Sequence, residues 1–103
     1  ETPELILDYL ARKKNIRGDE RQIMNCYKML GTYGPDRFVP FLRESLLDRG
    51  LDFSFDRSLR RQGAALALLE LNTKEAQDIL EKASKSLFPG VRSAYQKALK
   101  DHQ

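Results

Sequence analysis

The sequence predicts an all-α domain of six helices that stack in pairs. Apolar residues recur every three or four positions in six segments, which is the spacing of one helix face. Glycine, proline or N-capping residues separate these segments. Within residues 59–99 the same helix opening occurs twice, at Leu59-Arg60 and at Val91-Arg92. Internal repetition of this kind is typical of stacked helical units, and 103 residues are enough for one continuous core.

Three helices are predicted in the N-terminal half, over residues 3–13, 19–33 and 35–49. Thr2 and Asp19 suit the N-cap positions of the first two helices, and Gly50 ends the third. Gly31 is expected to loosen the end of the second helix. Pro40 removes a backbone donor from the third, so we expect an irregular first turn there. The predicted core positions are Leu5, Ile6, Tyr9, Leu10, Ile23, Cys26, Tyr27, Leu30, Phe38, Val39, Leu42 and Leu46.

Three more helices are predicted over residues 57–71, 73–86 and 90–100. Ser54 or Asp56 is expected to cap the first of these and Thr73 the second. The first also contains an unbroken apolar run over residues 64–69, which predicts a helix covered on several sides in the middle of the stack. The remaining predicted core positions are Ala76, Ile79, Leu80, Ala83, Val91, Ala94, Tyr95, Ala98 and Leu99.

Residues 51–56 separate the third and fourth helices, and their alternating pattern also fits a short strand. No partner strand is evident elsewhere in the sequence. We therefore interpret the segment as a loop whose leucine and phenylalanine side chains pack against the adjoining helices.

The helix pairs resemble HEAT repeats, particularly the short bacterial type that also occurs in phycobilisome-lyase-like proteins. The two Leu/Val-Arg openings carry the resemblance, together with the turn and proline pattern of residues 30–42. Leu30 and Leu68 are 38 positions apart, whereas Leu59 and Val91 are 32 apart, and the difference matches the length of the 51–56 loop. The resemblance implies a right-handed, armadillo-like α-solenoid. It also implies that Arg60 and Arg92 are structural, paired with acidic residues of a neighbouring repeat.

The composition gives no indication of catalysis. The 18 basic and 15 acidic residues are interleaved and leave a net charge of +3, without the one-sign block typical of a nucleic-acid-binding arm. Cys26 is the single cysteine, and its apolar neighbours favour an inert core thiol. His102 is the single histidine, next to the end of the chain, where side chains are usually solvated. HEAT-like DNA glycosylases and bilin lyases are alternatives, but no residue matches their sites. We predict no enzyme, no catalytic residue, no cofactor and no metal.

Charged residues opposite the core positions define the expected recognition surface. A wall of mixed sign suits a protein partner better than nucleic acid, although an ordinary solvated face explains it equally well. A second candidate surface is the 51–56 loop beside an arginine cluster, for which pairing with nearby aspartates is the alternative. The candidate partner-binding residues are Arg37, Glu44, Asp48, Phe53, Phe55, Arg57, Arg61, Lys74, Asp78, Glu81 and Lys85.

These features predict a non-catalytic protein-interaction or regulatory scaffold module. We expect it to be a cytoplasmic fragment of a larger bacterial signalling or assembly protein, because no membrane span or signal peptide is visible and the chain begins at Glu1. The alternative is a nucleic-acid-binding HEAT-like module that uses the Arg57–Arg61 patch. Apolar end faces, represented by Leu5, Leu7, Leu10, Tyr95 and Leu99, are expected to contact a neighbouring domain of the same chain or a second copy.

Overall fold

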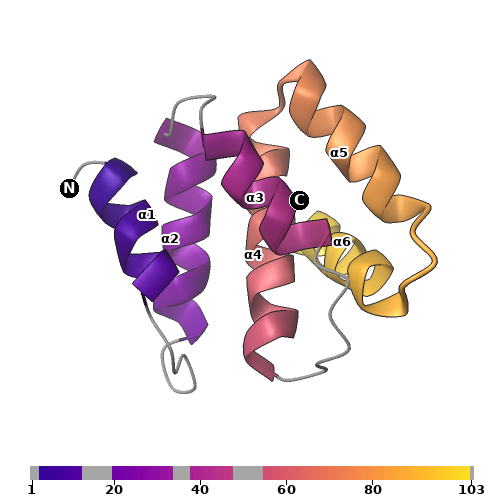
Figure 1. The fold of residues 1–103 in the computed structure, drawn as a ribbon, viewed down its shortest axis with the longest axis horizontal. Helices are drawn as coiled ribbons and strands as arrows, with labels where there is room; N and C mark the ends of the chain where they lie inside the picture. Colours follow the sequence, from indigo (N-terminus) through magenta and orange to yellow (C-terminus); the bar gives the residue numbers. More distant parts are fainter. Residues whose placement is uncertain (1–2, 13–19, 34–37, 48–54, 103) are drawn as a thin grey trace.

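A computed structural model describes residues 3–12, 20–33, 38–47 and 55–102. The described residues form helices and connecting turns, without a strand, which confirms the all-α prediction (Figure 1). The helices are α1 (Pro3–Arg12), α2 (Glu20–Tyr33), α3 (Val39–Leu47), α4 (Phe55–Leu71), α5 (Lys74–Ser84) and α6 (Pro89–His102).

Helix α4 lies at the centre of the fold and contacts α2, α3, α5 and α6 (Figure 1). Its apolar run is buried, with Ala64, Ala65, Ala67 and Leu68 fully enclosed. The run therefore has the location that its composition predicts, because a helix that is apolar nearly all round needs neighbours on several sides. Helix α1 packs on α2, and α5 packs on both α3 and α6. The resulting body is compact, with a Cα radius of gyration of 12.2 Å.

Two glycines allow α2 and α4 to approach closely. A Cβ atom on Gly31 would overlap the carbonyl oxygen of Ala67 and lie 2.8 Å from its Cα, both backbone atoms of α4. A Cβ on Gly63 would lie 2.6 Å from Cγ of Tyr27, whose ring is fully buried. The expectation that Gly31 loosens the end of α2 is therefore wrong: Gly31 is buried within the helix, where the absence of a side chain permits backbone contact.

Three helices begin at other residues than predicted: α3 at Val39 instead of residue 35, α4 at Phe55 instead of residue 57, and α6 at Pro89 instead of residue 90. Helix α3 begins at Val39 after a 3₁₀ turn at Phe38, so Pro40 lies in its first turn, where a missing N–H has no intrahelical acceptor. Helix α6 begins at Pro89, a favoured first position. Helix α4 begins at Phe55, so the last two residues of the predicted 51–56 loop are helical and Asp56 is not the cap.

Thr73 caps α5 as predicted. Its backbone is extended, with φ −82° and ψ 166°, and its Oγ1 accepts a 3.1 Å hydrogen bond from the Ala76 N–H. This bond satisfies one of the backbone donors that the first turn of a helix leaves unpaired. The other predicted caps, Thr2, Asp19, Ser54 and Gly50, lie outside the described residues.

Most predicted core positions are buried, including every one predicted on α3 and α5. Leu5 is the main correction, because this residue is 61% exposed and therefore not part of the core. Leu10 is fully buried, so it does not belong to an exposed end face. Tyr9, Cys26, Tyr95 and Leu99 are partly buried at the edges of the core. Among the described helices, none combines the length and apolar character needed to cross a membrane.

Candidate functional site

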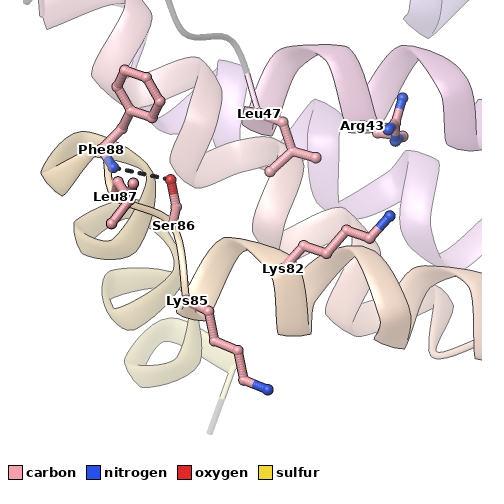
Figure 2. Close-up of a pocket in the computed structure, with 7 residues that line it drawn as sticks. All are labelled: Arg43, Leu47, Lys82, Lys85, Ser86, Leu87 and Phe88. Atoms are coloured by element: carbon pink, nitrogen blue, oxygen red, sulfur yellow. Dashed lines mark hydrogen bonds between the residues drawn. The ribbon is translucent and has the colours of Figure 1, made fainter.

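A surface pocket lies where α3, α5 and the α5–α6 connection meet (Figure 2). It encloses about 550 Å³, within the usual range for binding pockets. We call it the α3–α5 pocket. The described residues that line it are Arg43, Leu47, Lys82, Lys85, Ser86, Leu87 and Phe88.

Of the seven described residues that line the pocket, three are cations and none is acidic. The Arg43 guanidinium and the Lys82 amine lie toward one end of the pocket in Figure 2, while Lys85 extends below. Lys85 forms an exposed ion pair with Glu81, with 3.1 Å between Nζ and Oε1. Within the described part of the chain, neither Arg43 nor Lys82 has an ion-pair partner. The pocket therefore carries a local excess of positive charge.

The other end of the pocket is apolar. Leu87 and Phe88 lie there, and Leu47 lies between them and the Arg43 end (Figure 2). Leu87 is 90% exposed, although Leu47 and Phe88 are partly buried against the core. An isolated exposed leucine is common, but one that continues an apolar surface into a pocket is typical of a binding site.

The α5–α6 connection has a defined conformation because several hydrogen bonds hold it. The N–H groups of Lys85 and Ser86 donate to the carbonyls of Lys82 and Ala83 at the end of α5, each at 3.2 Å. The Phe88 N–H donates to the Ser86 hydroxyl at 3.1 Å. Arg92 on α6 donates through Nη1 to the Ser86 carbonyl. These bonds fix the backbone on both sides of Leu87, which presents its side chain to solvent.

The candidate residues on α3 and α5 have different relations to this pocket. Lys85 lines it, and Glu81 pairs with Lys85 at its edge. Glu44, Lys74 and Asp78 are exposed, as expected, but do not line it. Arg37, Asp48 and Phe53 lie outside the described residues.

The arginine cluster at the start of α4 is not the exposed patch that the sequence suggests. Arg61 is only 5% exposed, and its Nη1 lies so near Gly90 that a Cβ on this glycine would collide with it. Arg60 is partly buried and donates through Nη1 to the Leu10 carbonyl at 2.8 Å, joining α4 to α1. Phe55 and Arg57 lie in the first turn of α4. Two of the guanidinium groups in the proposed patch are thus directed into the protein.

Arg60 and Arg92 both have the structural character that the HEAT resemblance implies. Each donates to a main-chain carbonyl, Arg60 to Leu10 and Arg92 to Ser86. The resemblance implies acidic partners, whereas the acceptor described for Arg92 is a carbonyl and not a carboxylate. A carbonyl at the end of a helix or in a connection has a lone pair to satisfy, and a guanidinium is well suited to reach it.

Sequence reasoning missed most of the pocket. Two signals were available: Leu87-Phe88 is an apolar pair in a short connection just before a proline, and Lys82 and Lys85 are three positions apart within the predicted helix over residues 73–86. Arg43 gave no such signal, because only the packing of α3 on α5 brings it near the lysines.

The remaining candidates for chemical function are potential metal ligands, His102 and Cys26. Among the described residues, no three histidine, cysteine, aspartate or glutamate side chains gather where they could hold a metal ion. His102 Nε2 lies 3.7 Å from Oε1 of Glu70, and both side chains are partly exposed. Cys26 is partly buried.

Comparisons with known proteins gave no match to a family model, a curated protein or a solved structure.

Proposed function

We propose that this chain is a non-catalytic protein-interaction module, and that a segment of a protein partner binds in the α3–α5 pocket. The observation that carries the proposal is Leu87, which is 90% exposed at the apolar end of a pocket with a fixed backbone. Covering such a leucine with a partner removes apolar surface from water and favours association.

The proposal includes a HEAT-like arrangement of the helices. Its support is the order of contacts: α2, α4 and α6 touch in succession, α3 touches α5, and each of α1, α3 and α5 touches the helix that follows it. This order fits paired helices stacked in two layers. By the same resemblance, we propose a scaffold or regulatory role within a larger bacterial protein of the cytoplasm.

Nucleic acid is the weaker candidate. Arg60 and Arg61 are directed into the protein, and the helices α3 and α5 that carry pocket cations also expose Glu44, Asp78 and Glu81. A phosphate backbone is recognised by several cations in succession, and interspersed carboxylates repel it.

The test is a selection of peptides from a random display library against the purified chain, followed by direct affinity measurement on the enriched peptides. The proposal expects peptides that bind saturably at one site. A parallel titration with single- and double-stranded DNA at two salt concentrations tests the nucleic-acid alternative. Micromolar DNA binding that weakens steeply with salt, without any selected peptide, would overturn the proposal.

A further inference from the structure

We infer that the α3–α5 pocket binds an acidic segment of a protein partner, in which carboxylates flank one bulky apolar side chain. The inference rests on the proposed function and deepens it, because it gives the chemistry of the segment. It is carried by three cations, the absence of an acid among the described lining residues, and an apolar end in the same pocket.

The charges determine the sign of the segment. Arg43 lies on α3, Lys82 lies on α5 and Lys85 is the C-cap of α5, so the packing of α3 on α5 gathers three like charges around one pocket. Within the described residues only Lys85 of these three is compensated, by Glu81. Carboxylates placed at Arg43 and Lys82 would compensate these cations and form charge-assisted hydrogen bonds with them.

The apolar end determines what lies between the carboxylates. Leu47, Leu87 and Phe88 border one side of the pocket, and Leu87 is nearly fully solvated in the free protein. A phenylalanine or leucine of the partner would cover all three. Its burial would contribute affinity that a purely charged ligand cannot obtain, because exposed ion pairs alone are worth little.

The same observations favour a protein segment over another polyanion. A lipid surface or a phosphate backbone is a broad array of negative charge, whereas the cations here occupy one pocket with Glu44, Asp78 and Glu81 exposed on the same two helices. A short segment can place its acids on the cations alone.

Four short fluorescent peptides test the inference. The first carries a phenylalanine flanked by aspartate and glutamate; the second replaces the acids with lysine; the third replaces the phenylalanine with glycine; the fourth makes both changes. Binding to the full chain is measured by fluorescence anisotropy. We expect the first peptide to bind at least about tenfold more tightly than the second or third, which is the effect of losing one buried apolar side chain or its charge complement. Equal affinity for the first and second peptides would overturn the inference.

Variants of the chain locate the site. Lys82→Glu is expected to weaken binding of the first peptide about tenfold or more, whereas Lys28→Glu, the same charge change on the exposed face of α2, leaves it within about twofold. Leu87→Ser is expected to weaken binding about tenfold, and Leu5→Ser, at an exposed leucine of α1, to have little effect.

The outcomes separate this inference from the proposed function. If Lys82→Glu and Lys28→Glu weakened binding of the first peptide equally, the attraction would depend only on the net charge of the chain. That result would overturn the assignment of the site to the pocket. Library peptides that bind tightly but lack acids, or that are insensitive to Leu87→Ser, would overturn the inference and leave the interaction module in place. A failure of every peptide, designed or selected, would remove both.

Discussion

Gly31→Ala is expected to destabilise the protein, although alanine is the better helix former. The added Cβ would lie 2.8 Å from the Cα of Ala67 and closer still to its carbonyl oxygen, whereas ordinary van der Waals contact begins at 3.4 Å. Two of the colliding atoms are backbone atoms of Ala67 and the third is the Cβ of Glu70, so no side-chain rotation relieves the overlap. Helices α2 and α4 would have to separate by at least about 0.6 Å, the difference between these distances. A gap of that size forfeits roughly a quarter to a half of the dispersion energy of the contacts that it opens.

The magnitude follows from two opposing effects. Overpacking a close contact costs about 1–3 kcal/mol, and the backbone collision places this site at the upper end of that range. The higher helix propensity of alanine offsets about 1 kcal/mol of this cost in the free energy of unfolding. The net loss is therefore about 2 kcal/mol, which lowers the melting temperature of a domain of this size by roughly 10 °C.

Urea unfolding followed by circular dichroism measures this loss. Asn25→Ala is the matched control, because it adds alanine at an exposed position of the same helix and is expected to change the stability by no more than a few tenths of a kcal/mol. If Gly31→Ala stabilised the protein as much as Asn25→Ala, the close approach of α2 and α4 would be refuted.

Three further predictions concern stability. Thr73→Ala removes the N-cap of α5 and is expected to cost about 1 kcal/mol in urea unfolding, with Thr73→Ser retaining most of the stability; equal loss in both would contradict the capping role. Burial raises the pKa of Tyr27 above 10.0, although the nearby Arg60 and Ser45 oppose the shift. Because the unfolded tyrosine then ionises first, stability should fall as the pH rises above about 10, and Tyr27→Phe should reduce this fall; an identical pH profile would count against it. Arg92→Met removes the bond to the Ser86 carbonyl, and faster amide exchange around residues 85–88 is expected by NMR; unchanged exchange would show that the connection is held by other contacts.

The helices of this fold could be predicted because each is marked locally. Thr73 and the apolar spacing of α5 define that helix without reference to its neighbours. The alanine-rich run of α4 likewise indicated a helix enclosed on several sides, and it is the helix that four others contact.

The errors arose where the environment of a residue depends on tertiary contacts. Gly31 has the same local sequence whether it loosens the end of a helix or permits contact between two helices, and its role is decided by Ala67 across the interface. Arg61 belongs to a sequence cluster that resembles an exposed patch, yet α6 covers it at Gly90.

The candidate site depended on tertiary structure in the same way. Arg43 and Lys82 are 39 positions apart in the sequence, and nothing in either segment indicates that they share a pocket. Leu87 was accessible to sequence reasoning as an apolar residue in a short connection. Its nearly complete exposure could be known only from the structure.

The most direct test of the central claim is an NMR titration of the isotopically labelled chain with the acid-flanked phenylalanine peptide. A partner segment in the α3–α5 pocket should shift the amide signals of Arg43, Leu47 and residues 82–88 together, saturably, with little change on α1 or α2. Shifts concentrated at the start of α4 or spread over all basic surfaces, with the signals of residues 82–88 unmoved, would contradict it.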